Sequence, residues 1–217
     1  PQIKTEKKLK LYTKEQLELF LNEVSQEQNP YFKNRDYTLF RLLAFSGCRI
    51  GEILALTWDN INFKTNEMAI KKTVARSDKY YISETPKTKK SNRIIYLDEK
   101  TIKQLKFWKL EQRKYLFQLG FTKANYLFTN DENNFTINQS VAERYNIYRE
   151  RAGLPYIGLH GFRHTHASML YEAGADHKEV QERMGHANIK TTMDTYTHIT
   201  NSKKEETTQK LTNYINF

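Results

Sequence analysis

Apolar residues recur at helical spacing near the start of the chain, on what would be one helix face: Leu17, Phe20, Leu21 and Val24. Thr13 and Gln16 hold the positions of a capping box, in which each side chain bonds the backbone N–H of the other residue. Tyr12 and Leu17 are spaced as a hydrophobic staple. The pattern therefore predicts a helix that begins directly after Thr13.

Two helices separated by a glycine are predicted next. The first covers about residues 35–46 and ends at Gly47, because glycine readily takes the left-handed conformation at a helix end. The second is short and contains Ile50, Ile53 and Leu54. Arg49 therefore stands at the junction of the two helices.

Three β-prone runs follow between about Met68 and Leu97, namely MAIKKTV, KYYIS and RIIYL, and charged turns separate them. They predict a small antiparallel sheet. Asp98 then precedes a long helical pattern that ends at Gly120. Taken with the helices, this sheet indicates a mainly α fold with a small antiparallel β-sheet, of the α+β class.

The last third of the chain carries three helical patterns. A capping box of Thr136 and Gln139 begins the first, and its apolar face is formed by Val141, Tyr145 and Tyr148. The other two cover about residues 162–173 and 176–184, and the second starts with a capping pair formed by Asp176 and Glu179. The tyrosines at helical spacing, Tyr171 among them, are interpreted as packing residues.

Composition divides the chain into one folded domain with polar ends. Residues 1–10 are charged and lack periodicity, as is typical of the remnant of an interdomain linker. Residues 11–200 carry the predicted elements and form the expected domain, while the tail 201–217 is polar with a few apolar positions and is predicted to be a helix.

Charge and hydropathy narrow the class of protein. A formal net charge of +10 indicates an acidic polymer as partner, because clustered Lys and Arg displace the counterions of a phosphate backbone. No run of residues is apolar and long enough to predict a membrane span. The single cysteine, Cys48, excludes an internal disulfide, fits a reducing cytoplasm and is interpreted as a small buried hydrophobe.

All six histidines lie between His160 and His198, a clustering that raises the question of a metal site. One cysteine, no HExxH pattern and the interleaved Arg163 argue against a cation, so no metal and no cofactor are predicted. Arg49 and Arg163 fit an anion better, because a planar guanidinium grips two phosphate oxygens and keeps its proton. For either arginine alone, a surface salt bridge is the simpler explanation.

Four segments, taken in order, resemble the signature boxes of the tyrosine recombinase (phage integrase) family: SGCRIGEIL, PKTKKSNR, HGFRHTHASML and MGHANIKTTMDTYTH. The resemblance extends from about Thr13 to Thr200, and the wording of the last box is most similar to integrases of Gram-positive phages and conjugative transposons. It implies the fold of a tyrosine recombinase catalytic domain over 11–200. It also implies a site-specific recombinase or integrase that cleaves and rejoins DNA through a 3′-phosphotyrosine intermediate.

The family pattern implies roles for matching residues. Arg49 and Arg163 would hold the scissile phosphate, and Lys87 in the basic hairpin would protonate the leaving 5′-oxygen, with Lys89 and Lys90 as nearby alternatives. The charges of the hairpin, from Lys87 to Arg93, would enter or border a DNA groove.

The remaining matches complete the implied site. His160 would accept or donate a proton near the phosphate, His186 would hydrogen-bond it, and Tyr196 would attack. Glu52 matches an acidic residue that orients its neighbours without contacting substrate. A tyrosine has an ordinary pKa of about 10, so its oxygen needs nearby positive charge or a base to act at neutral pH.

The resemblance implies double-stranded DNA as partner, a homotetramer in the synaptic complex, accessory DNA-bending or directionality proteins, and the cytoplasm of a bacterial cell as location. The tail 201–217 would pack on a neighbouring protomer. Two alternatives stay open on the sequence: DNA relaxation of the type IB topoisomerase kind, and a DNA-binding protein that keeps the fold without catalysis. The wording of the last box argues against the first, and the complete set of candidate residues argues against the second.

Overall fold

The computed structural model describes residues 10–84 and 92–185. The helices of this part are α1 (Lys14–Ser25), α2 (Pro30–Ser46), α3 (Ile50–Leu54), α4 (Glu99–Gln118), α5 (Asn138–Arg151), α6 (Gly158–Glu172) and α7 (His177–Met184), with a 3-10 turn at Trp58–Asn60. The strands are β1 (Ile61–Asn62), β2 (Glu67–Ile70), β3 (Thr73–Arg76), β4 (Tyr80–Ser83) and β5 (Arg93–Tyr96). Lys87, Lys89, Lys90, His186, Tyr196, the first nine residues and the tail 201–217 lie outside the described residues.

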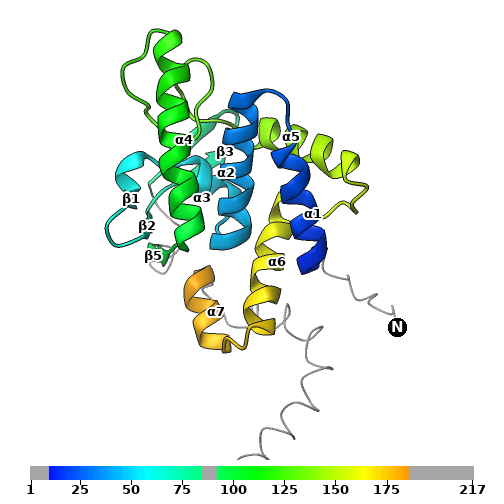
Figure 1. Cartoon of the computed structure of the whole chain (residues 1–217). Coiled ribbons are helices and arrows are strands. Elements are labelled where there is room, and N and C mark those ends of the chain that lie inside the picture. Colours follow the sequence, from blue (N-terminus) through cyan, green and yellow to red (C-terminus); the bar gives the residue numbers. More distant parts are fainter. Residues whose placement is uncertain (1–9, 85–91, 186–217) are drawn as a thin grey trace, which may run out of the picture.

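Helix α2 lies at the centre of the helical layer. Figure 1 shows α1 and α6 on one side of it and α4 on the other, with α5 packed on α1 and α6. Five buried aromatic side chains fill the space between these helices: Phe20, Phe40, Tyr145, Tyr148 and Phe162. Phe20 lies at the middle of this group, with its ring centroid 5.0 Å from that of Phe40 and 5.2 Å from that of Phe162. Close aromatic packing therefore fixes the helices that carry the candidate residues.

The predicted capping boxes of α1 and α7 are confirmed. Thr13 and Gln16 exchange side-chain to backbone bonds at 3.0 and 3.2 Å, and the four predicted apolar residues of α1 are buried. Asp176 and Glu179 form the same box at the start of α7. Both boxes satisfy backbone N–H groups that have no partner within the helix.

Three helix starts differ from the prediction. Helix α2 begins at Pro30 because the Asn29 side chain accepts from the N–H groups of Tyr31 and Phe32, and proline suits the first helical position. Helix α6 begins at Gly158, which places His160 and Arg163 on one helix. The predicted capping box of α5 is wrong: Gln139 bonds Glu143 within the helix, and Thr136 is buried ahead of it.

The β-prone runs form two antiparallel sheets where one was predicted. Strands β2 and β5 pair with Met68 opposite Ile95, and β1, which the sequence analysis missed, joins the outer edge of β2. Strands β3 and β4 form a separate ribbon. Apart from this division, the predicted class is confirmed: the described part is mainly helical with small antiparallel sheets.

Candidate active site

The turn between α2 and α3 sets the position of Arg49. Gly47 ends α2 in the left-handed conformation, with φ of 66°, and a Cβ there would lie 2.5 Å from His166 Cδ2 and 2.7 Å from Met184 Sδ. Only glycine therefore fits this conformation and this close contact with α6 and α7. Arg49 follows as the N-cap of α3, and its side chain is 43% exposed.

Glu52 is the acidic centre of the site. Its carboxylate accepts from the Arg49 backbone N–H at 2.9 Å and from Arg49 Nη1 at 3.0 Å. It also accepts two bonds from Arg93, at 3.1 and 2.8 Å. Burial raises the pKa of Glu52, but Arg93 and Arg49 outweigh that effect and lower it, so the carboxylate is ionised at neutral pH.

Arg163 is buried beside this carboxylate without an ion pair to any described residue. Its side chain donates from Nη1 to the Gly47 carbonyl at 2.6 Å and from Nη2 to the Met184 carbonyl at 2.5 Å. Burial and then the positive charge of Arg49 lower the pKa of Arg163 to about 9, so the guanidinium keeps its proton at neutral pH. We refer to Arg49, Glu52, Arg93 and Arg163 as the arginine-rich cluster, in which three guanidinium groups lie around one carboxylate.

His160 lies one helical turn before Arg163 on α6. Surrounding protein atoms partly shield the His160 ring from water, and this effect, followed by the charges of Arg163 and Arg49, lowers its pKa. Part of the residue is nevertheless exposed to solvent. The imidazole is therefore neutral at pH 7 and can accept a proton. His164, whose ring is 4.7 Å from that of His160, also has a lowered pKa, to about 4.

Two arginines bind carbonyls in the last turn of α7, and a third, Arg183, anchors this turn to its neighbours through its own side chain. Arg93 Nε donates to the Arg183 carbonyl at 3.0 Å, next to the Met184 carbonyl that Arg163 holds. The Arg183 side chain donates to His166 Nε2 at 3.0 Å and to the Phe45 carbonyl at 3.0 Å. Positive groups are well placed at these carbonyls because a helix C-terminus carries partial negative charge.

The structure thus brings four of the predicted site residues together: Arg49, Glu52, His160 and Arg163. Lys87, His186 and Tyr196 lie outside the described residues. The predicted exposure of the hairpin charges is wrong for Arg93, whose side chain is only 7% exposed.

Sequence reasoning also missed Arg93 and Arg183 as parts of the site. Strand alternation could have revealed the first, since Arg93 shares a strand face with the buried Ile95, whereas Ile94 and Tyr96 are exposed. Cys48 lies next to the site and is buried as predicted, with a thiol pKa that burial raises to about 11.

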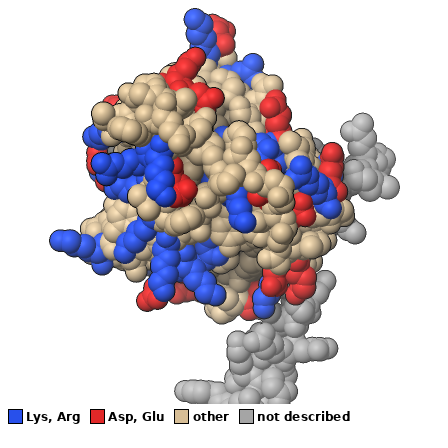
Figure 2. All heavy atoms as spheres, turned by 45° about the horizontal axis from the view of Figure 1, so that its top comes forward, with Lys and Arg blue, Asp and Glu red and all other residues tan. Residues whose placement is uncertain are grey.

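The arginine-rich cluster can stabilise an anion. Its positive charge exceeds its negative charge, and Arg49 still has free N–H groups facing solvent. Surface charge alone does not locate this site: Figure 2 shows Lys and Arg spread over the visible face with Asp and Glu among them.

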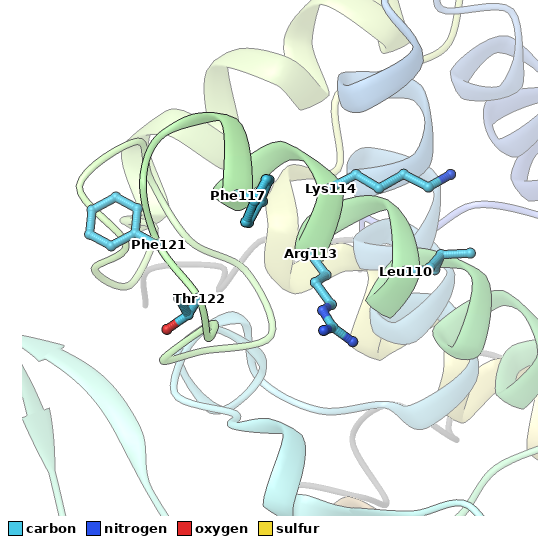
Figure 3. Close-up of a pocket in the computed structure, with 6 residues that line it drawn as sticks. All are labelled: Leu110, Arg113, Lys114, Phe117, Phe121 and Thr122. Carbon is cyan, nitrogen blue, oxygen red and sulfur yellow. The ribbon is translucent and has the colours of Figure 1, made fainter.

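Other candidate features lie apart from the site. A hollow at the C-terminal end of α4, shown in Figure 3, is lined by Leu110, Arg113, Lys114, Phe117, Phe121 and Thr122 and contains none of the predicted site residues.

In residues 10–84 and 92–185, no three His, Cys, Asp or Glu side chains gather as they would around a metal ion. None of the helices in these ranges has the length and apolar character to cross a membrane.

Comparisons with known proteins agree with the sequence boxes. The family model of the phage integrase family matches residues 10–203. The chain is 31% identical over 208 residues to the ICEBs1 integrase of Bacillus subtilis (strain 168), covering 95% of this chain and 55% of that protein. It therefore spans about half the length of the relatives it matches.

Two solved structures share the fold. The Tn1549 transposon integrase in complex with circular intermediate DNA matches with a TM-score of 0.75 and 27% identity, over 96% of this chain and 68% of that one. The catalytic domain of bacteriophage HP1 integrase shares the fold at a TM-score of 0.59 and 20% identity, over 93% and 95% of the two chains. The similarity to integrases of Gram-positive mobile elements expected from the last box is confirmed by the Bacillus and transposon relatives. The chain belongs to the phage integrase family of tyrosine recombinases.

Proposed function

We propose that this chain cleaves and rejoins DNA strands at specific sites through a 3′-phosphotyrosine intermediate. The observation that carries the proposal is Arg163, a buried guanidinium whose hydrogen bonds to described residues go only to backbone carbonyls. A buried charge is costly unless a counter-charge compensates it, so the site is built to receive an anion. DNA supplies that anion as the scissile phosphate.

In the cleavage step, the Tyr196 oxygen attacks phosphorus and the bond from phosphorus to the 5′-oxygen breaks. The tyrosine proton passes to His160, which is neutral at pH 7, and Lys87 gives a proton to the leaving 5′-oxygen. In rejoining, a 5′-hydroxyl attacks the phosphotyrosine, the bond from phosphorus to Tyr196 breaks, and both protons return. Each step exchanges one phosphodiester for another, so neither a metal nor ATP is needed.

Arg49 and Arg163 stabilise the charge that develops on the phosphate oxygens. Both arginines lower the pKa of His160, so their charges lie within electrostatic reach of its ring. This proximity supports a phosphate position beside the proton acceptor. The roles of Lys87, His186 and Tyr196 are carried over from the family pattern.

The larger assembly follows from the same proposal. In this arrangement residues 11–200 form the catalytic domain, and the tail 201–217 packs on a neighbouring protomer within a homotetramer on double-stranded DNA. Accessory DNA-bending or directionality proteins assist the reaction, which takes place in the bacterial cytoplasm. A tail-deleted variant that still cleaves but no longer assembles on DNA would support this arrangement.

Covalent trapping tests the nucleophile. The full chain is incubated with a suicide duplex that carries the end of its own mobile element, and denaturing electrophoresis detects the adduct. Tyr196→Phe should bind DNA normally and form no adduct. An adduct formed by Tyr196→Phe at the normal rate would show that another residue attacks.

The same assay tests the anion site. Arg49→Lys and Arg163→Lys keep the charge but lose the two-point grip, so each should slow cleavage by about 10²–10³-fold, as the loss of a transition-state donor does. Cleavage close to the normal rate by either variant would contradict its role. Strand exchange between two duplexes, compared with relaxation of a supercoiled plasmid, separates recombination from topoisomerase activity.

A further inference from the structure

Arg93 connects three separate parts of the site. Strand alternation turns its side chain inward from β5, where it is 7% exposed and pairs at two points with Glu52, which is 6% exposed. Its Nε donates to the Arg183 carbonyl at the end of α7. Nη2 also lies 3.5 Å from Cys48 Sγ. One guanidinium therefore joins the sheet, the turn before α3 and α7.

The pairing of Arg93 with Glu52 determines what Arg49 is free to do. Because Arg93 takes both carboxylate oxygens, Arg49 makes one side-chain bond to Glu52, at 3.0 Å, and remains 43% exposed. Without Arg93, Arg49 would be the one ion-pair partner left to this buried carboxylate among the described residues. A buried carboxylate that has lost its main partner attracts the nearest cation strongly.

Arg93 also supports the turn that holds Arg163. Gly185 has φ of 65°, and a Cβ there would lie 3.1 Å from both Cδ and Nη1 of Arg93, so the backbone packs directly on this side chain. Arg93 and Arg163 bind successive carbonyls, those of Arg183 and Met184. The orientation of Arg163 therefore depends on a helix end that Arg93 fixes.

We propose that Arg93 is a positioning residue for strand cleavage: it holds Glu52 and the end of α7 so that Arg49 and Arg163 present their donors to the phosphate. This inference rests on the proposed function. Arg93 acts through these neighbours, since its own guanidinium is buried and its donors are engaged by protein groups.

The test compares the full wild-type chain with Arg93→Met, Arg93→Lys and the double variant Arg93→Met/Glu52→Gln. Single-turnover cleavage of the suicide duplex is measured at saturating protein, with DNA affinity and melting temperature measured beside it. Arg93→Met should lower the cleavage rate by about a hundredfold while DNA affinity changes by less than about threefold. Arg93→Lys should recover little, because lysine cannot pair with Glu52 at two points and reach the Arg183 carbonyl as well.

The double variant separates positioning from simple support of the fold. Adding Glu52→Gln to Arg93→Met removes the uncompensated carboxylate that would capture Arg49, so cleavage should rise by about tenfold over Arg93→Met alone. Arg144→Met is the matched control, because Arg144 also pairs with buried carboxylates but lies on α5, outside the arginine-rich cluster. Its loss should lower the melting temperature and leave the cleavage rate of the folded protein unchanged.

Each outcome bears on one proposal. If wild type forms no adduct, the proposed function fails. If wild type cleaves and Arg93→Met cleaves within about threefold of it, or if Glu52→Gln gives no gain in the Arg93→Met background, Arg93 merely supports the fold and the inference is overturned. Where Arg93→Met does not fold, the polar but uncharged variant Arg93→Gln takes its place in both comparisons.

Discussion

Two clusters of charged side chains in this protein differ in how their positive charge is matched by carboxylates. In the group we call the balanced cluster, Arg144 donates to Asp36 at 2.7 Å and to Glu27 at 2.6 Å, while Arg35 donates to Asp36 at 2.8 Å. Tyr148 also donates to Asp36, at 2.8 Å. In the arginine-rich cluster, Arg49, Arg93 and Arg163 share the single carboxylate of Glu52. The first group neutralises itself within the fold, and the second keeps surplus positive charge.

The difference separates a structural site from a functional one. Carboxylates complete the balanced cluster, which joins α2 to α5 and the segment after α1. The arginine-rich cluster keeps positive charge that no carboxylate of the described residues matches. Under the proposed function that charge receives the phosphate, and a preorganised site of this kind does not have to reorganise as the reaction proceeds. Buried positive charge that lacks a carboxylate partner is therefore the feature that marks the functional site.

The largest expected effect on stability tests this contrast directly. Arg144→Met removes the cation that Asp36 and Glu27 share, leaving Asp36 with Arg35 alone and Glu27 with Arg151 at 3.8 Å. Because the two carboxylates are only 3% and 11% exposed, this loss should lower the free energy of unfolding by about 3 kcal/mol. Arg163→Met removes a buried cation that has no carboxylate partner in the described part and should cost clearly less, while abolishing cleavage. Urea unfolding of both variants measures the two costs.

The comparison of the two clusters is contradicted if the two losses of unfolding free energy are reversed. A larger loss of stability in Arg163→Met than in Arg144→Met would mean that the bonds from Arg163 to the Gly47 and Met184 carbonyls matter more to the fold than its charge. Arg144→Lys is the matched control, because it keeps the charge and loses only the two-point geometry.

A somewhat smaller effect concerns pH and His166, which adjoins the arginine-rich cluster. Arginine only donates, so His166 Nε2 accepts from Arg183, and Nδ1–H donates to the Ala44 carbonyl at 2.8 Å. Burial, followed by the charge of Arg183, lowers the pKa of His166 from 6.5 to about 4. Its neutral form therefore contributes stability above pH 6.5, and this contribution is lost as the pH falls from 6.5 towards 4.

The loss at the lower end of this window should be at most about 3 kcal/mol, from the size of the pKa shift. His164 shifts in the same direction, so His166→Gln should reduce the slope of stability against pH without removing it. The balanced cluster responds at lower pH: burial opposes ionisation of Glu27, but the Asn29 N–H and Arg144 outweigh it and hold its pKa below 4.5. Unfolding curves that are flat between pH 6.5 and 4.5 would contradict this assignment.

The smallest effect concerns the two ends of α7. Asp176 accepts from the N–H groups of Lys178 and Glu179 at 2.7 and 2.8 Å, so Asp176→Ala should cost about 1 kcal/mol of stability. Cleavage should change little, because Arg93 and Arg163 hold the opposite end of the helix. Thr13→Ala, at the corresponding cap of α1, is the control, and a hundredfold loss of cleavage in Asp176→Ala alone would show that the cap controls the site.

Local sequence signals predicted the helices well, but they failed where contacts between distant residues determine the start or cap of a helix. The caps at Thr13 and Asp176 lie within one turn of the groups they satisfy, so the sequence reveals them. The same pattern at Thr136 and Gln139 forms no cap, because Thr136 is buried by tertiary packing and Gln139 has Glu143 within reach. The start of α2 was missed although Asn29 and Pro30 are a local signal.

Prediction of the candidate site from the sequence also fails where distant residues pair. Arg49, Glu52, His160 and Arg163 were predicted through the family boxes and lie together in the structure. Arg93 was interpreted as a DNA-facing charge of the hairpin, because its pairing with Glu52 joins residues 41 positions apart and composition says nothing of such a pair. Only the inward direction of alternate residues in β5 indicates that the Arg93 side chain is buried.

The binding of the α7 carbonyls by Arg93 and Arg163 has a consequence for synthesis of the chain. Domains form as the ribosome releases them, N-terminal parts first. The two arginines lie upstream of their acceptors at Arg183 and Met184, so neither has its final orientation until that turn has emerged. A nascent chain that stops before α7 therefore contains both guanidinium groups but lacks the geometry of the finished site.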